Sequence, residues 1–236
     1  MHAGLQCWDI CSEQDSPILV KDFGIVDDCA VTSITISNDN QTLFGGNEHG
    51  WFWAYSVVSQ ERVKDFGKIF NNEILRILIT FDNNHIICGC GKTGQLKIFD
   101  NPSWNLQKET VSNSQLTAIA ISKDSQAIYT LERVSDTYSA NSDVLRVRNI
   151  DKMQKSFGAG ELTTANAYNG FTFKLDSSTS RMILIANTYD GKYLYISDSK
   201  GNILVYSIAD KRIIRVFRKA HGSKITAIAC SYNSKL

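Results

Sequence analysis

The chain has 236 residues, a formal net charge of +1 and a hydrophobic content of 43%. This charge balance gives no overall field that would favour nucleic acid or an anionic membrane. Two prolines and fifteen glycines exclude a collagen-like or low-complexity chain. No apolar run approaches the roughly 20 residues of a membrane span, and the N-terminus lacks the apolar centre of a signal peptide. We therefore expect a cytoplasmic protein whose six cysteines are reduced and mostly buried.

The predicted elements are short strands in a repeated order. Residues 1–24 hold two of them, at 4–10 and 18–23, and form a partial unit. Whole units of four strands follow at about 31–67, 75–111, 116–157 and 182–218, and residues 225–236 begin one more. The clearest copy is MILIANTYDGKYLYISDSKGNILVYS from Met182, where turns at Asp190-Gly191 and Gly201 separate three apolar runs.

A fixed spacing connects these units. The first strand and its turn recur as VTSITISNDN at Val31, LRILITFDNN at Leu75, LTAIAISKDS at Leu116 and ITAIACSYNS at Ile225. The turn residues lie 43, 42, 66 and 43 residues apart; they are Asp39, Asp82, Asp124, Asp190 and Asn233. A period of about 40 to 45 residues with four short strands is typical of a propeller blade. The sequence thus predicts an all-β propeller of four-stranded antiparallel blades, with four full blades and partial blades at both ends.

The third strands carry a second pattern. Residues 5–9 read LQCWD, and weaker copies are FWAY at 52–55, LKIFD at 96–100, LRVR at 145–148 and ILVY at 203–206. With the period, this pattern resembles the WD-repeat β-propeller family over essentially the whole chain. The family often joins a His, a Ser or Thr, an Asp and the Trp of one blade by hydrogen bonds. Here His49, Thr93 and Lys200 stand at the Asp position, and only His221 stands where the family has its His. We therefore expect apolar packing between blades to hold them together.

Two arrangements of the blades remain open. The partial blades at the two ends combine into a fifth, three-stranded blade, or the chain is part of a larger propeller, for example of seven blades and about 300 residues. We favour the larger propeller, because a five-bladed ring is unusual for the family that the chain resembles. An uncovered blade edge is an aggregation hazard, so the chain is expected to need further blades or a partner chain.

Two polar insertions are candidate partner-binding loops. Residues 132–143 lengthen a connection between second and third strands, and residues 158–181 lengthen a connection between blades. Both connections emerge on the same face of a propeller, and long loops on a rigid scaffold often carry recognition. Their aromatic side chains are of the kind favoured at interfaces: Tyr138, Tyr168, Phe171 and Phe173. The alternatives are tolerated surface elaborations, or a local strand in GFTFKLD.

A basic segment is the second candidate surface. Residues 211–224 contain six Lys or Arg residues and no acid, and the candidate contacts are Arg212, Arg215, Arg218 and Lys219. Such a strand could bind phosphate or an acidic partner. The alternative is the solvated outer edge of a blade.

Other motifs predict no cofactor and no metal. GCGKT at 89–93 resembles the end of a phosphate-binding loop, but Ile86 replaces the required glycine and a strand follows in place of a helix. Cys88 and Cys90 lack accompanying ligands at a familiar zinc spacing, so they are expected in the core.

No catalytic constellation surrounds the four histidines. The sequence therefore favours a non-catalytic scaffold that presents propeller faces and loops to other proteins in a multiprotein complex. The alternatives are an enzyme with a site in the central channel, and a phosphate or nucleic-acid reader that uses residues 211–224. The binding of such a reader would weaken steeply with salt.

Overall fold

A computed structural model describes residues 5–9, 17–22, 29–110, 114–134, 142–151, 153, 172–174 and 180–231. All regular elements in these ranges are strands. A two-stranded antiparallel sheet comes first, from β1 (Gln6–Asp9) and β2 (Ile18–Asp22).

Four sheets of four strands each follow it, here called blades 1 to 4. Blade 1 contains β3 (Val31–Ile36), β4 (Thr42–Asn47), β5 (Trp51–Ser56) and β6 (Arg62–Lys68). Blade 2 contains β7 (Ile74–Ile79), β8 (His85–Cys90), β9 (Leu96–Asp100) and β10 (Leu106–Thr110). Blade 3 contains β11 (Gln115–Ile121), β12 (Ala127–Val134), β13 (Ser142–Asn149) and β14 (Thr172–Lys174). Blade 4 contains β15 (Met182–Asn187), β16 (Tyr193–Asp198), β17 (Ile203–Ser207) and β18 (Arg212–Phe217).

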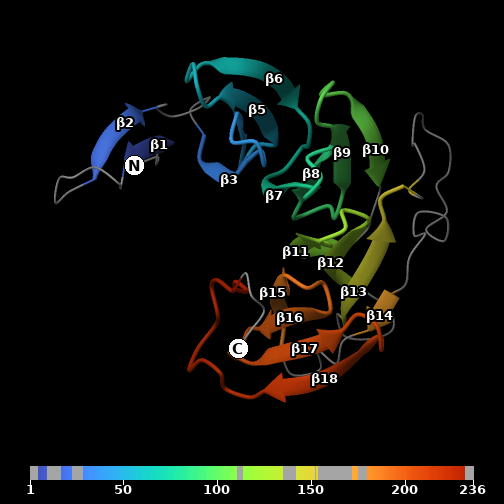
Figure 1. Ribbon diagram of the computed structural model, residues 1–236. Coiled ribbons are helices and arrows are strands. Elements are labelled where there is room, and N and C mark those ends of the chain that lie inside the picture. The colour runs from blue at the N-terminus through green and yellow to red at the C-terminus, as the bar shows by residue number, and fades with distance from the viewer. Residues whose placement is uncertain are drawn as a thin grey trace.

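The four blades form an arc with their first strands on the inside (Figure 1). Within each blade, consecutive strands pair as an antiparallel meander. The first strands of successive blades contact one another, β3 with β7, β7 with β11, and β11 with β15. The outer strands β6, β10 and β18 lie on the rim of the arc (Figure 1). This architecture confirms the predicted all-β class and the four-stranded blades.

Burial follows the position of a strand within its blade. In β8 the residues from Ile86 to Cys90 are all buried, whereas β6 and β18 are largely exposed. Side chains alternate between the two faces of a strand. Accordingly, Ile86 and Cys88 pack into the cluster shared with blade 1, and Ile87 packs into the cluster shared with blade 3. A second strand therefore needs apolar residues at consecutive positions because both of its faces are covered.

One apolar cluster joins each pair of successive blades, as predicted. Phe44 and Phe52 of blade 1 pack with Ile74 and Ile77 of blade 2. Two further clusters join the next pairs: Ile87, Leu96 and Ile98 with Leu116, Ile119 and Ile128, and then Leu131 and Leu145 with Met182, Leu194 and Tyr206. Each buried side chain of this size contributes about 1.5–3 kcal/mol. Hydrophobic burial between blades is thus the main stabilising contribution along the arc.

The turn between first and second strands has the same three hydrogen bonds in blades 1, 3 and 4 and two of them in blade 2. In blade 1 the Ser37 hydroxyl donates to Asp39, Asp39 accepts from the amide of Gln41, and the Ser37 hydroxyl accepts from the amide of Thr42. The same three bonds, with the same spacing, centre on Ser122 with Asp124 and on Thr188 with Asp190. In blade 2 the amides of Asn84 and His85 bond to Asp82 and Thr80. The residue after the aspartate has a positive φ in all four turns: Asn40, Asn83, Ser125 and Gly191.

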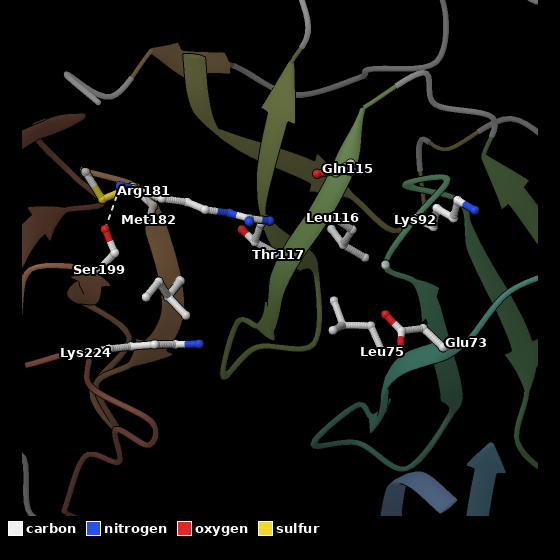
Figure 2. A pocket seen from close by; sticks show the side chains of 12 residues that line it. Glu73, Leu75, Lys92, Gln115, Leu116, Thr117, Arg181, Met182, Ser199 and Lys224 are labelled. Atoms are coloured by element: carbon white, nitrogen blue, oxygen red, sulfur yellow. Dashed lines mark hydrogen bonds between the residues drawn. The ribbon is translucent and has the colours of Figure 1, made fainter. Parts of the chain in front are cut away.

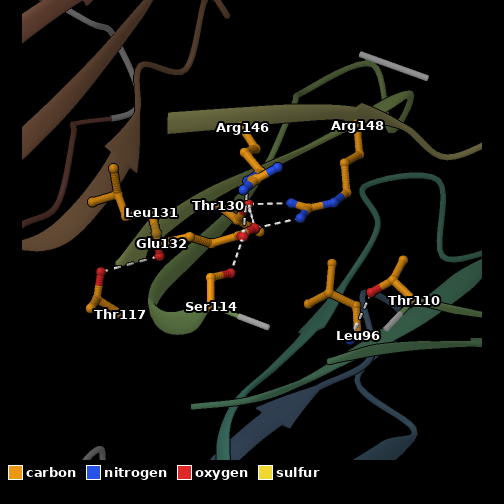
Figure 3. A network of polar contacts seen from close by, with 9 residues as sticks. All are labelled: Leu96, Thr110, Ser114, Thr117, Thr130, Leu131, Glu132, Arg146 and Arg148. Atoms are coloured by element: carbon orange, nitrogen blue, oxygen red, sulfur yellow. Dashed lines mark hydrogen bonds and ion pairs between the residues drawn. The ribbon is translucent and has the colours of Figure 1, made fainter. Parts of the chain in front are cut away.

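A buried ionic network in blade 3 adds to the expected apolar packing between blades (Figure 3). Glu132 and Arg148 are 1% and 0% exposed and form a direct ion pair. Arg146 Nε lies 3.0 Å from the other oxygen of Glu132, which also accepts a hydrogen bond from Ser114. Arg148 also donates to Thr130, whose hydroxyl donates to Glu132 over 2.7 Å. The network ties the segment before β11 to β12 and β13.

Three boundaries differ from the sequence-based ones. The outer strand of blade 3 is β14, which pairs with β13 and lies beyond the expected end at residue 157. Its position within 158–181 agrees with the alternative of a local strand in GFTFKLD. The expected insertion 132–143 is partly strand, because β12 continues to Val134 and β13 begins at Ser142.

Residues 225–230 were expected to form a first strand, but the structure shows no strand there. They also do not pair with β1 or β2, so the described residues contain no fifth blade made from both ends. The apolar pattern ITAIAC has the same composition as a first strand, but a first strand forms only where a second strand pairs with it.

Candidate partner-binding site on the inner wall

A pocket of about 650 Å³ opens on the inner wall of the arc, where the beginnings of the first strands of blades 2, 3 and 4 converge (Figure 2). Blade 2 contributes Glu73 and Leu75, with the turn after β8, and blade 3 contributes the start of β11. Blade 4 contributes the start of β15 and the turn after β16. The full lining is Glu73, Leu75, Gly91, Lys92, Gln115, Leu116, Thr117, Arg181, Met182, Ile183, Ser199 and Lys224.

The rim of this pocket is mainly positive. Lys92, Arg181 and Lys224 are exposed cations, and Glu73 is the single carboxylate among the described residues of the lining. Figure 2 shows the side chain of Arg181 reaching across the pocket toward Thr117. A concave surface lined by charges of one sign concentrates the field and attracts ligands of opposite charge. The pocket therefore suits a ligand with carboxylate or phosphate groups.

The floor of the pocket is apolar. Leu116 and Met182 are 3% and 1% exposed, and each also belongs to an inter-blade cluster. A Cβ atom at Gly91 would lie 3.1 Å from Glu73 Oε1, so the glycine gives this carboxylate room at the edge. Apolar walls with a few polar groups are typical of ligand sites.

Backbone hydrogen bonds between and within blades fix the geometry of the lining. The amide of Leu116 donates to the carbonyl of Gly91 over 2.8 Å and so connects blade 3 to blade 2. The amide of Arg181 donates to Ser199 Oγ over 3.0 Å, and the amide of Ser199 donates to the carbonyl of Arg181 over 2.7 Å. The amide of Met182 donates to the buried carboxylate of Asp143 in blade 3 over 2.7 Å. A rigid lining loses little conformational entropy on binding.

The predicted basic residues all lie on or directly after the outer strand of blade 4. Arg212 and Arg215 are in β18, Arg218 and Lys219 follow it, and all four are exposed. The guanidinium of Arg215 lies 4.5 Å from the centre of the Phe217 ring. They are on the rim, as expected for a fourth strand, and none of them lines the pocket. Lys224, at the end of the same basic segment, does line it.

The predicted aromatic residues are largely outside the described residues. Tyr138, Tyr168 and Phe171 fall in ranges that the structure does not describe. Phe173 is in β14, and its backbone is paired opposite Leu145. Its proposed partner contact stays a prediction.

The pocket cations were not recognised as one site from sequence. Lys92 appeared only within GCGKT, Arg181 only as the end of an insertion, and Lys224 only as the end of the basic segment. These residues come from different parts of the repeat. The spacing in the sequence does not show which connections between strands meet around the same pocket. The recurring position at the start of each first strand is the one signal that could have suggested it.

The other motifs behave as the sequence indicates. GCGKT spans the end of β8 and the turn before β9, so a strand follows it. Cys88 and Cys90 are completely buried, and burial raises the pKa of the Cys88 thiol. Cys7 is exposed, which corrects the expectation of burial for that residue.

Comparison with solved structures agrees with this architecture. The chain is similar to the crystal structure of the Cps50 (Swd1) β-propeller domain of Myceliophteria thermophila, with a TM-score of 0.63 and 10% sequence identity. The fold is a β-propeller. The match covers 85% of this chain but 59% of that one, so the chain spans less than two thirds of the propeller domain that it matches. At this identity the likeness concerns the fold alone.

Searches by sequence add no relative. No family model matches the chain, and no curated protein matches it. Within the described residues, no helix has the length and apolar character needed to cross a membrane.

Proposed function

We propose that the protein is a WD-repeat-like propeller that acts as a non-catalytic scaffold for protein partners, and that the inner-wall pocket binds an acidic, extended segment of one partner. The observation that carries this proposal is that Lys92, Arg181 and Lys224 line one pocket with an apolar floor. The propeller fold supports it, because its blades hold loops from distant parts of the chain at fixed positions before binding.

The basic rim and the insertion aromatics are proposed as secondary contacts. Arg212, Arg215, Arg218 and Lys219 give the rim of blade 4 an exposed positive edge. Tyr138, Tyr168, Phe171 and Phe173 are proposed to add aromatic contacts from the insertions. A partner that spans from pocket to rim would use both charged surfaces.

Binding of a fluorescent peptide tests the pocket. The probe is a 12-residue peptide that alternates Glu with Leu or Phe, and fluorescence anisotropy measures its affinity for the whole chain. We expect Arg181→Glu and Lys224→Glu each to weaken binding by at least tenfold, because each reverses a charge at the pocket. The matched control is Arg212→Glu with Arg218→Glu, which makes the same change on the rim.

The same assay tests the two alternatives, a binding site on the rim and a nucleic-acid ligand. If the rim variant abolishes binding and the pocket variants do not, the binding site belongs on β18 and the pocket proposal is wrong. A single-stranded oligonucleotide is measured in parallel at low and moderate salt. If it binds more tightly than the peptide with a steep salt dependence, a nucleic-acid reader replaces the protein scaffold.

We also propose that a further blade, from this polypeptide or from a partner chain, covers the open face of blade 1. Ile34 of β3 is 50% exposed. The residues at the same position of the other first strands, three before the hydroxyl of the turn, are Ile77, Ile119 and Ile185, and their exposure is 1%, 5% and 9%. The preceding blade covers this position in each case, so its exposure in blade 1 indicates a surface built to be covered.

A further inference from the structure

Three side chains of metal-binding type meet at the inner end of blade 1. Cys29 comes just before β3, and Glu48 and His49 form the turn between β4 and β5. The Cys29 sulfur, a carboxylate oxygen of Glu48 and a ring nitrogen of His49 all lie within 4.8 Å of one another. Among the described residues, no other group of three or more Cys, His, Asp or Glu side chains brings its ligand atoms this close together.

The backbone around this cluster holds the two segments together. The amide of Glu48 donates to the carbonyl of Ala30 over 3.1 Å, and the amide of Ala30 donates back to Glu48 Oε1 over 3.0 Å. The turn itself is fixed by Asn47, whose Oδ1 accepts from the amides of His49 and Trp51, each over 3.0 Å. Ala30, next to Cys29, is therefore hydrogen-bonded directly to Glu48, next to His49. Such outer contacts orient ligands and strengthen metal binding.

The far side of the turn is fixed as well. Gly50 has a φ of +85°, and a Cβ atom there would lie 2.1 Å from the carbonyl oxygen of Phe70. The amide of Ile69 donates to the carbonyl of Gly50 over 2.9 Å. Only glycine fits this close approach, so the backbone that carries Glu48 and His49 is held from both sides.

Burial gives the cluster one closed and one open side. Cys29 is 8% exposed, whereas Glu48 and His49 are exposed. The sulfur is thus held at the protein side, the amide of Ala30 holds the Glu48 carboxylate, and the side chain of His49 is exposed. Ligands of a tetrahedral Zn²⁺ lie about 3.3 to 3.8 Å apart, given Zn–ligand distances of about 2.0 to 2.3 Å. Small rotations of Glu48 and His49 bring the three atoms into this range.

We propose that Cys29, Glu48 and His49 bind one Zn²⁺ ion, with water as the fourth ligand. Thiolate and imidazole ligands favour Zn²⁺ over Mg²⁺ and Ca²⁺, which prefer oxygen ligands. Binding requires the thiol to lose its proton, so one proton is released to solvent as the Zn–S bond forms. The bound ion would connect the segment entering blade 1 to the turn after β4. This proposal does not depend on the proposed partner-binding function.

Cobalt binding to the whole chain tests the site. The purified protein, without an affinity tag, is treated with a chelator, dialysed and titrated with Co²⁺. We expect one equivalent of Co²⁺ to give the visible bands of tetrahedral coordination and the near-ultraviolet band of a Co–thiolate bond. One equivalent of Zn²⁺ should remove both, and Zn²⁺ should raise the melting temperature of the protein.

The variants identify the ligands. Cys29→Ser should abolish the thiolate band, and Glu48→Gln and His49→Asn should each weaken Co²⁺ binding by at least tenfold. The last two residues are exposed, so these variants should fold normally even if Cys29→Ser does not. The matched controls are Cys7→Ser and His221→Asn, which change an exposed cysteine and an exposed histidine elsewhere.

Two outcomes overturn the proposal. One is the absence of a stoichiometric Co²⁺ spectrum in the unmodified chain. The other is a spectrum that survives in both Glu48→Gln and His49→Asn, or that disappears in Cys7→Ser or His221→Asn, because a site elsewhere would then bind the metal.

Discussion

Arg148 occupies the third-strand position where blades 1, 2 and 4 have Tyr55, Phe99 and Tyr206. Its guanidinium is buried, so it needs a buried counter-charge, which Glu132 of the neighbouring strand provides. Burial raises the pKa of Glu132, but the positive charge of Arg148, with Ser114 and Arg146, outweighs it and lowers the pKa below its ordinary value of 4.5. Blade 3 thus replaces an aromatic side chain by an ion pair at the same place.

Neutralising Glu132 should be more destabilising than neutralising an outer glutamate. In Glu132→Gln, two arginines remain at a buried site without their carboxylate, so we expect a loss of about 3 to 5 kcal/mol in the free energy of unfolding. The matched control is Glu109→Gln, which changes a partly exposed glutamate 3.6 Å from Lys97. Its expected cost is about 0.2 to 1 kcal/mol. Urea unfolding measures both, and equal losses would show that the network adds nothing beyond a surface pair.

The element that repeats most exactly is the turn between first and second strands. Its aspartate accepts hydrogen bonds from a hydroxyl and from an amide in three blades. Hydrogen bonds from Ser37 and from the amide of Gln41 lower the pKa of Asp39 below 3.8. Those from Thr188 and the amide of Lys192 lower the pKa of Asp190 in the same way.

These turns should make stability depend on pH in the acid range. Because the folded-state pKa is below the unfolded-state value of 3.8, the contribution is complete above about pH 4 and is lost as the pH falls through the folded-state pKa. In Asp39→Asn with Asp190→Asn, the free energy of unfolding should be lower at neutral pH and should fall less between about pH 5 and about pH 2. Urea unfolding at several pH values measures this.

Asp151→Asn is the control for the turn variants, because it changes an exposed aspartate two residues after the end of β13. It should follow the curve of the unmodified protein. If the turn variant also follows that curve, its carboxylates do not contribute to the acid sensitivity.

At the scale of the whole molecule, each blade depends on its neighbours. A four-stranded sheet has two apolar faces. The three inter-blade clusters cover the faces where blade 1 meets blade 2, blade 2 meets blade 3, and blade 3 meets blade 4. On the other face of blade 1, the side chains of Ile34 and Ile36 are 50% and 46% exposed. The two-stranded sheet of β1 and β2 also exposes Trp8, Leu19 and Val20.

The isolated chain of 236 residues is therefore expected to self-associate as its concentration increases. Ile34→Lys should shift the population toward monomer with little change in melting temperature, because this side chain is already half exposed. Val58→Lys, in an exposed turn, is the matched control and should leave the association unchanged. Size-exclusion chromatography with light scattering measures the mass. A monomer at all concentrations with one cooperative melt would contradict the proposal of an uncovered face.

Much of the architecture follows from sequence because it depends on local patterns. The turn acids and apolar runs placed all four blades, since an antiparallel meander needs only short connections between adjacent strands. The outer strand of blade 3 was misplaced, because β14 pairs with β13 but is separated from it by a long stretch of sequence. The pattern at 225–230 predicted a strand that lacks a pairing partner in the structure.

The candidate sites depended on tertiary structure. Lys92, Arg181 and Lys224 line one pocket only because the arc places the turn after β8, the residue before β15 and the segment after β18 around a common opening. Cys29 meets His49 only because β3 and β4 pair and bring the two ends of a hairpin together. Sequence periodicity determines which residues enter strands and turns, since that depends on local propensity and side-chain alternation. The curvature of the arc and the packing between blades decide which of those turns come together, and these are non-local.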